Sequence, residues 1–205
     1  MPSQSKGPRG RFIVFEGGDG SGKSTQARLF AEKIGATLTR EPGGTPIGEQ
    51  IRAVVLDPDH PELDPRTEAL LMAAARAQHV AELIEPSLER GISVVSDRFL
   101  ASSLAYQGVA RGLGVESVTT ANALALGGLQ PDLTVLLQVP AEAARGRLSR
   151  DLDRIEQASL DEVVVQAYAE FAANDPDQWL VIEAVGSIED IHEQVVDGVR
   201  ERLGL

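Results

Sequence analysis

The chain of 205 residues has 42% hydrophobic and 24% charged side chains, which is ordinary for a soluble globular protein, so composition alone names no activity. Its net charge of −12 argues against binding to a nucleic acid polymer, because such binding needs a basic surface. The chain has no cysteine, which excludes disulfides and thiolate metal sites, and no apolar run reaches the roughly 20 residues of a membrane helix. With no long apolar core near its start, the sequence predicts a cytoplasmic protein without a membrane segment.

The first residues, MPSQSKGPRG (1–10), are polar, rich in glycine and proline, and precede the first apolar run. We expect them to form a flexible N-terminal segment outside the fold. The length then favours a single domain over residues 11–205. The acidic, proline-broken stretch at 57–66 is typical of a surface connection between helices.

Short apolar runs alternate with longer helical patterns along the rest of the chain. The runs predict strands at 11–16, 36–40, 91–97, 133–139 and 179–184. Helices are predicted at 23–35, 46–56, 67–91 and 187–204, with a bend at Pro86 and Ser187 as an N-cap. We expect two short helices between the third and fourth strands, and an arginine-bearing connection between the fourth and fifth, entered through a helix near residue 140. The alternation predicts an α/β fold with a five-stranded parallel sheet flanked by helices.

The stretch EGGDGSGKST (16–25) joins the first predicted strand to the first helix. It satisfies G-x-x-x-x-G-K-[ST] in the strand–loop–helix context that this phosphate-binding motif requires. The loop amides and the helix N-terminus would surround an anion, Lys23 would reach the outer phosphates, and Ser24 would ligate Mg²⁺. The alternative is a glycine-rich turn with a surface lysine. The ATP-binding residues expected from this loop are Gly17, Gly18, Asp19, Gly20, Ser21, Gly22, Lys23, Ser24 and Thr25.

Phosphate binding alone does not distinguish a kinase from a switch or a motor. A GTPase would need D-x-x-G and N-K-x-D motifs after residue 25, and a transporter-type ATPase would need L-S-G-G-Q. The sequence has neither set. A small-molecule kinase therefore remains.

The third predicted strand ends in SDRFLASSLAYQG (96–108). An aspartate at such a strand tip can order Mg²⁺, and the arginine beside it can bind an acceptor phosphate through two parallel hydrogen bonds. Asp97 and Arg98 fit these catalytic roles, and Asp97 joins Ser24 as a metal residue. The alternative for the two residues is a plain ion pair at the end of a strand.

This stretch resembles bacterial thymidylate kinases. The D-R-[YF]-x-x-S-x-x-A-Y-Q run of that family is matched at Asp97, Arg98, Phe99, Ser102, Ala105, Tyr106 and Gln107. The similarity extends to 39–52, 73–79, 130–137 and 153–157, and it covers nearly everything after residue 11. The resemblance implies a P-loop nucleoside monophosphate kinase fold and a homodimer. It also implies Mg²⁺-dependent transfer of the γ-phosphoryl group of ATP to dTMP, giving dTDP and ADP in dTTP biosynthesis.

The resemblance also implies roles for residues that would contact dTMP. Asp19 would hold the 3′-hydroxyl, Arg76 would donate to a thymine carbonyl, and Tyr106 would crowd the 2′ position. Ser103 and Gln107 would address the base edge, Arg52 and Arg98 the monophosphate, and Glu41 the sugar or the metal site. Arg40 could serve only to tie down its turn. Met72 stands where the family commonly has an aromatic residue stacked on thymine, and it could equally be a core residue.

Phosphoryl transfer also requires a positive charge over the moving group. One branch of the family carries this arginine in the glycine loop, at the position of Gly20 here. The other carries it in a lid, which corresponds to about residues 145–157 of this chain. We therefore predict that the lid delivers the arginine, with Arg150 as the first candidate and Arg154 as the second.

Two rival interpretations remain open. The chain could be a kinase for another nucleoside monophosphate, UMP or CMP, or a nucleotide-binding regulatory module without turnover. His60, His79 and His192 are scattered along the sequence in polar surroundings, and we interpret all three as surface or structural residues.

Overall fold

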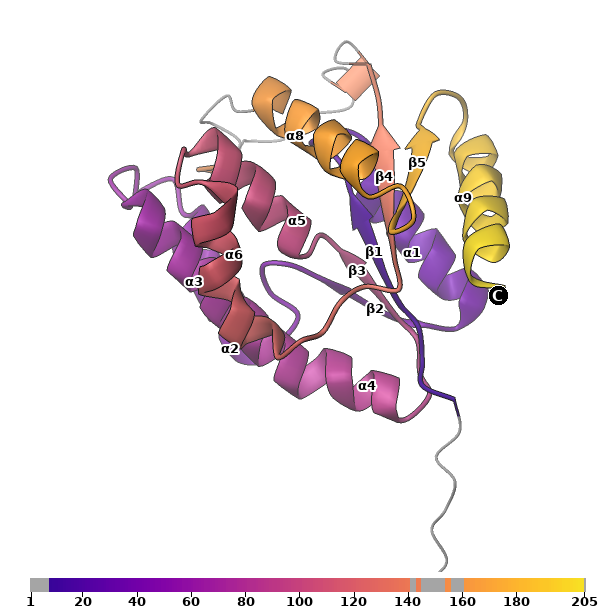
Figure 1. The fold of residues 1–205 in the computed structure, drawn as a ribbon, viewed down its shortest axis with the longest axis horizontal. Coiled ribbons are helices and arrows are strands. Elements are labelled where there is room, and N and C mark those ends of the chain that lie inside the picture. The colour runs from indigo at the N-terminus through magenta and orange to yellow at the C-terminus, as the bar shows by residue number, and fades with distance from the viewer. Residues whose placement is uncertain (1–7, 141–142, 145–153, 156–160, 205) are drawn as a thin grey trace, which may run out of the picture.

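A five-stranded, all-parallel sheet forms the centre of the protein, as the sequence predicts (Figure 1). The computed structural model describes residues 8–140, 143–144, 154–155 and 161–204. The strand order is β2-β3-β1-β4-β5. The strands span Phe12–Glu16 (β1), Thr37–Arg40 (β2), Val94–Asp97 (β3), Leu133–Gln138 (β4) and Trp179–Glu183 (β5).

The register of the sheet places functional candidates side by side at the carboxyl ends of the strands. All five residues of β1 are buried, as expected for a parallel strand that helices cover on both faces. Phe15 pairs with Asp97 of β3, so the last residues of β1 and β3 lie side by side. Ligands of open α/β sheets bind at the carboxyl ends of the strands, and this is where Glu16 and Asp97 lie.

Helices α1 (Lys23–Ile34) and α9 (Ile188–Leu203) cover one face of the sheet. Apolar side chains of both helices, including Phe30 and Val195, join Phe15 in one buried cluster. The N-terminus of α9 has a capping box, in which the Ser187 hydroxyl accepts from the amide of Asp190 and the Asp190 carboxylate accepts from that of Ser187. The predicted N-cap is confirmed.

The other helices lie on the opposite side of the sheet in Figure 1. They are α2 (Pro46–Leu56), α3 (Pro65–His79), α4 (Glu85–Glu89), α5 (Leu100–Ser103), α6 (Val115–Leu126), α8 (Asp161–Asn174) and the π-helical segments η1 (Val80–Ile84) and η2 (Leu104–Ala110). The connection between α2 and α3 is the acidic stretch expected at the surface. Within the described ranges, no helix is both long and apolar enough to cross a membrane.

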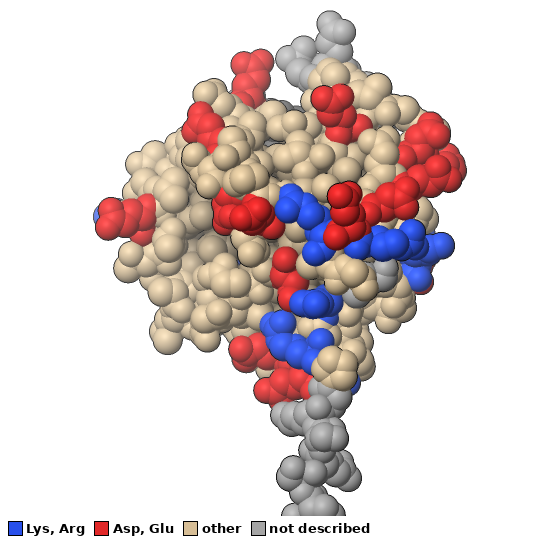
Figure 2. All heavy atoms as spheres, turned by 45° about the vertical axis from the view of Figure 1, so that its right-hand side comes forward, with Lys and Arg blue, Asp and Glu red and all other residues tan. Residues whose placement is uncertain are grey.

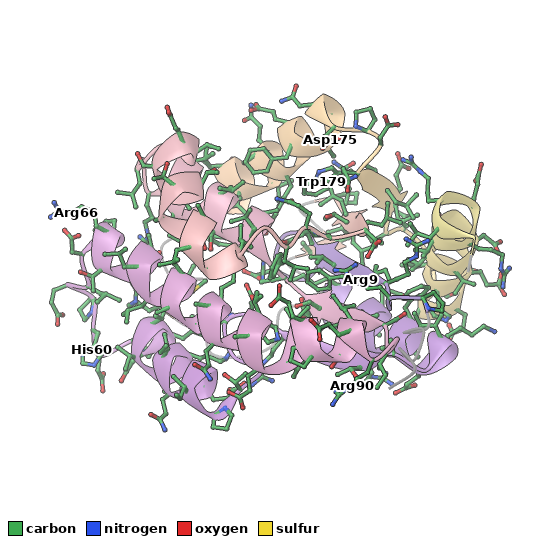
Figure 3. The ribbon with its side chains drawn as sticks, turned by 60° about the horizontal axis from the view of Figure 1, so that its bottom comes forward. Arg9, His60, Arg66, Arg90, Asp175 and Trp179 are labelled. Carbon is green, nitrogen blue, oxygen red and sulfur yellow. The ribbon has the colours of Figure 1, made fainter. Side chains whose placement is uncertain are left out.

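The helix predicted over 67–91 consists of three joined elements. Figure 3 shows α3, η1 and α4 as one rod that runs from Arg66 to Arg90. Pro86 has no amide hydrogen to continue the helical ladder, and the π-helical turn directly precedes it. The predicted disturbance at Pro86 is therefore a change of helix type.

Two further elements differ from the sequence prediction. The third strand begins at Val94 and not at residue 91, because Gly91 ends the preceding helical turn with a φ of 78°. The connection between β4 and β5 contains α8, a helix of 14 residues that the sequence analysis did not predict. Of the helix expected near residue 140, Ala143 and Ala144 are helical, and much of the arginine-bearing part lies outside the described residues.

Candidate active site

A cavity of about 590 Å³ lies at the carboxyl ends of β1, β2 and β3. It collects residues from the glycine loop, the turn after β2, α3 and the segment after β3. The candidates named from the sequence that line it are Asp19, Lys23, Ser24, Glu41, Arg52, Met72, Asp97, Arg98, Tyr106 and Gln107. Arg76 and Ser103 are fully buried and are not among the lining residues.

The glycine loop connects β1 to α1 as the motif predicts. Gly20 has a φ of 77°, in the region that favours glycine. A Cβ at this position would lie 2.5 Å from the carbonyl oxygen of Ala144, so the loop touches the chain that follows β4. Lys23 is the first residue of α1, and its Nζ lies 3.2 Å from Oδ1 of Asp19. Burial and the nearby Arg98 lower the pKa of Lys23, against the opposing effect of Asp19.

Asp19 links the phosphate-loop lysine to the arginine after β3. Its Oδ1 accepts from Nη2 of Arg98 at 2.6 Å as well as from Lys23, and its Oδ2 accepts from the Tyr106 hydroxyl at 3.3 Å. Burial alone would raise the pKa of Asp19, but Arg98 and Lys23 lower it to about 2. The carboxylate therefore stays charged and joins two cations at one point of the cavity.

Arg98 has an unusual backbone conformation, with a φ of 71°. Such values are uncommon outside glycine. The turn is fixed by its amide, which donates to Phe15 O, and by its carbonyl, which accepts from the Ser96 hydroxyl. Because the chain turns sharply here, both Asp97 and Arg98 line the cavity.

A buried network that the sequence analysis missed supports the Arg98 side chain. Glu16 Oε1 accepts from the amides of Phe99 and Ser102, and its Oε2 accepts from the hydroxyls of Ser102 and Tyr168. The Tyr168 hydroxyl also lies 3.1 Å from Nη1 of Arg98. Burial raises the pKa of Glu16, although Arg98 and these hydrogen bonds lower it in part. An acidic residue at the end of a buried strand was the available signal for Glu16, while Tyr168 had none.

A second buried network lies below the turn after β2. Arg76 is 1% exposed, and its guanidinium group donates to Glu41, Asn122, Ser103 and the carbonyl of Phe99. His79 lies between Glu41 and Thr39, with Nδ1 3.0 Å from Oε1 of Glu41 and Nε2 2.7 Å from the Thr39 hydroxyl. The second network holds Arg76 and His79 in place and orients Glu41 at the cavity wall. Of the other histidines, His60 is exposed and His192 is partly buried on α9.

The turn itself is tied down by two arginines. Arg40 pairs with Glu49 at 2.9 Å, which is the restricted role considered for it. Arg52 donates to the carbonyl of Pro42 at 2.9 Å and lines the cavity. Met72 is 7% exposed; it lines the cavity and also packs in an apolar cluster with Tyr106. Met72 therefore has one side that a base could contact and another that belongs to the core.

Of the two lid candidates, Arg154 lies within the described residues. Arg150 lies outside them, as does most of the expected lid. Arg154 is described, and it is 7% exposed. Its guanidinium group bonds to Glu68 and to the carbonyl of Val55, and its amide donates to the carbonyl of Leu56 at the end of α2. In this structure Arg154 thus forms a buried ion pair with Glu68, and it is not among the residues that line the cavity.

Comparison with known proteins gives concordant results. The model of the family described as "Thymidylate kinase" matches residues 15–195. A thymidylate kinase of Kosmotoga olearia is 48% identical over 194 residues, which cover 90% of this chain and 93% of the relative. A thymidylate kinase of Lactobacillus helveticus is 44% identical, covering 95% of this chain and 98% of the relative. The crystal structure of a thymidylate kinase from Ehrlichia chaffeensis superposes with a TM-score of 0.76 at 31% identity, covering 94% and 99% of the two chains.

The parallel sheet and its glycine loop define a P-loop kinase of the nucleoside monophosphate kinase class. Such enzymes are transferases that use a nucleotide as the phosphoryl donor. The chain belongs to the thymidylate kinase family.

Proposed function

We propose that this enzyme transfers the γ-phosphoryl group of ATP to dTMP, giving dTDP and ADP. The observation that carries the proposal is that Lys23 and Arg98 meet at one cavity, where both bond to Asp19. A phosphate-loop lysine serves the donor, and an arginine at the neighbouring strand end suits a monophosphate acceptor. Membership of the family supports thymidylate as that acceptor.

The acceptor phosphate is already anionic, so the reaction needs no general base and the residues act through alignment and charge. The loop amides and Lys23 would hold the outer phosphates of ATP, and Arg98 and Arg52 the phosphate of dTMP. Phosphate oxygens accept charge-assisted hydrogen bonds from the same groups that Asp19 now engages. Substrate binding would thus release the Asp19 carboxylate, which could then accept from the 3′-hydroxyl of dTMP.

The thymine base would lie against Met72 and Gln107, which line the cavity. Tyr106 would limit the space at the 2′ position, and Glu41 would face the sugar. Arg76 and Ser103 lie behind the wall and bond to each other at 3.1 Å. A hydrogen bond from Arg76 to the base would therefore require exchange of one of its present partners.

The residues present fit a magnesium ion bound with ATP. Asp97 Oδ1 is buried and has no hydrogen-bond partner among the described residues, and Asp97 and Ser24 line the same cavity. In the described ranges no group of three histidine or acidic side chains could hold a metal ion by itself. Mg²⁺ bound with ATP needs only a few protein oxygens, because phosphates and water supply its other ligands. Ser24 and Asp97 would hold the ion, which neutralises charge on the phosphates when bound.

We propose that Arg150 supplies the positive charge over the transferred group. Delivery from the lid and not from the loop is supported by Gly20, which has no room for a side chain beside Ala144. The choice of Arg150 over Arg154 is supported by the buried pair in which Arg154 is bonded to Glu68.

A panel of acceptors with ATP and Mg²⁺ tests the proposal. We expect dTMP to be phosphorylated with a higher kcat/KM than dUMP, UMP or CMP. Preference for UMP or CMP would favour the rival monophosphate kinase. ADP release should be abolished by Lys23→Ala; negligible release by both the parent and this variant would favour a regulatory module without turnover.

We also propose a homodimer packed through α3 and α6, which lie side by side. Leu70 of α3 is 60% exposed and Leu124 of α6 is 94% exposed, and the small side chains of Ala74 and Ala81 continue the exposed face of the rod. Light scattering should give a dimer that Leu70→Asp with Leu124→Asp converts to a monomer. Ile188→Asp on α9, where Ile188 is 52% exposed, is the control. A monomeric parent would reject the proposal.

Four expectations from the sequence remain predictions. They are a flexible segment at 1–10, of which 1–7 lie outside the described residues, a cytoplasmic location, a single domain over 11–205 and no binding to nucleic acid polymers. The last is supported by the net charge of −12. Figure 2 shows a face on which Lys and Arg side chains alternate with Asp and Glu and form no uniformly basic surface.

A further inference from the structure

Glu68 forms a buried hydrogen-bonding centre beside the cavity. It lies in the first turn of α3, and it is 0% exposed. Its Oε1 accepts from Nε2 of Gln107 at 2.8 Å, and its Oε2 accepts from Nη2 of Arg111 at 3.2 Å and from Nη2 of Arg154. One carboxylate therefore joins α3, η2 and the described part of the chain before α8.

Two ion pairs hold the Glu68 carboxylate in place. Two guanidinium groups pair with the carboxylate, and the first turn of a helix favours a negative charge. Removal of such a group from water without partners would be very costly, whereas here both cations are within ion-pair distance. A charged carboxylate can only accept hydrogen bonds.

This restriction fixes the side-chain amide of Gln107. An amide has one end that donates and one that accepts, and only the NH₂ end can face an acceptor-only carboxylate. The carbonyl Oε1 must then face away from Glu68. Gln107 lines the cavity, and its Oε1 is buried with no hydrogen-bond partner among the described residues. A buried carbonyl without a partner is costly unless a ligand supplies a donor.

We infer that Glu68 is a positioning residue that determines which base the enzyme accepts. This inference rests on the proposed function and deepens it. By holding the Gln107 amide in one orientation, Glu68 presents a hydrogen-bond acceptor to the base. Thymine carries an N–H group at N3 that can donate to the Gln107 carbonyl oxygen. Cytosine carries an acceptor at N3, so two hydrogen-bond acceptors would face each other without a proton between them. Glu68 itself touches no substrate.

The test compares dTMP with 5-methyl-dCMP, because the two nucleotides share the methyl group and differ on the edge that includes N3. In Glu68→Gln the partner of Gln107 can donate as well as accept, so the Gln107 amide can turn. We expect the preference for dTMP, as a ratio of kcat/KM values, to fall on the order of 10-fold. Any effect of the exocyclic group at C4 is common to the parent and the variant, so it cancels in the comparison.

Three variants make the result decisive. Glu82→Gln changes an exposed glutamate of the same rod, whose carboxylate accepts from Gln78, and should leave the ratio unchanged. In a Gln107→Leu background, Glu68→Gln should no longer alter the ratio. Glu68→Asp keeps the negative charge but shortens the side chain by one methylene group, which weakens the hydrogen bond to Gln107. It serves as the second variant if Glu68→Gln does not fold.

The outcomes separate the inference from the proposed function. Equal losses of kcat/KM for both nucleotides in Glu68→Gln and Glu68→Asp would show a structural role only and overturn the inference. A change of the ratio in the Gln107→Leu background would overturn it as well. A parent enzyme that does not phosphorylate dTMP at all would overturn the proposed function too.

Discussion

The Asp19 carboxylate lies 2.6 Å from the guanidinium group of Arg98, and this pair closes the space between the glycine loop and the end of β3. Lys23 joins it from the other side at 3.2 Å. Lys23 and Arg98, which are proposed to hold the donor and the acceptor, are thus bridged by a single carboxylate, that of Asp19. Substrate phosphates have to compete with that carboxylate, so its charge should influence both folding and binding.

Asp19→Asn should remove a pH-dependent part of the stability. The pKa of Asp19 is about 2 in the folded protein and about 3.8 without partners, because Arg98 and Lys23 outweigh burial. Its contribution, about 2 kcal/mol, is complete above about pH 5 and is lost as the pH falls toward 2. Urea unfolding should show a constant difference between parent and variant from pH 8 to 5 that shrinks at lower pH. The exposed Asp59→Asn is the control, and a difference that does not change with pH would contradict the prediction.

Tyr168→Phe should weaken acceptor binding. The lost hydroxyl contacts Arg98 at 3.1 Å, Ser102 at 2.8 Å and Glu16 at 3.0 Å, so three buried groups lose a partner. We expect the unfolding free energy to fall by about 1–3 kcal/mol and the KM for dTMP to rise several-fold, with little change in the KM for ATP. Phe171→Leu, in the apolar cluster of the same helix, should lower stability alone. Equal KM values for dTMP in both variants would refute the role of the hydroxyl.

Gly20→Arg should inactivate the enzyme and not supply a second catalytic arginine. Any side chain there has a φ of 77° and a Cβ 2.5 Å from Ala144 O, so the loop or the chain after β4 must shift. Gly20→Ala should show most of the decrease in kcat that Gly20→Arg shows. Gly35→Ala is matched in backbone, with a φ of 67° but nothing within 4 Å, and should cost only about 1 kcal/mol of stability. Full activity of Gly20→Arg would show that the loop tolerates the substitution.

Arg150 and Arg154 should separate into a catalytic and an anchoring residue. Arg150→Ala should lower kcat by roughly 100-fold or more and leave stability unchanged, because the charge acts on the transferred group. Arg154→Met should lower the unfolding free energy by about 3 kcal/mol, since Glu68 loses a buried ion-pair partner. Steady-state kinetics and urea unfolding of both variants test the assignment. A stable Arg154→Met with the larger loss of kcat would reverse it.

Met72→Phe should lower the KM for dTMP, because an aromatic ring stacks on a base more favourably than a thioether does. Met72 is 7% exposed and packs against other apolar side chains, so the larger ring should also cost about 1–3 kcal/mol of stability. Met72→Leu, which keeps the volume without an aromatic face, should not lower KM. An unchanged or higher KM in Met72→Phe would assign Met72 to the core.

Most features that depend on consecutive residues could be predicted from the sequence, although helix α8 was missed. The strands, the glycine loop and the Ser187 cap each depend on local pattern, and the structure has all of them. Contacts between distant residues could not be predicted. Glu16 of β1 meets Tyr168 of α8, and Glu68 of α3 meets Arg154, although the members of each pair lie far apart in the sequence, so only the folded chain brings them together. The sequence therefore identified many of the charged and polar residues of the cavity wall, but not buried groups such as Glu16, Glu68 and Tyr168 that orient them.

The left-handed backbone at Arg98 has a consequence for how β3 ends. Neighbouring residues of a strand point to opposite faces, so an extended Asp97 and Arg98 would diverge. The turn rotates the second side chain back, and one short peptide thereby brings an anion and a cation to the wall of the same cavity. Glycine would relax this backbone but remove the guanidinium group, so the local strain accompanies the residue that carries the charge.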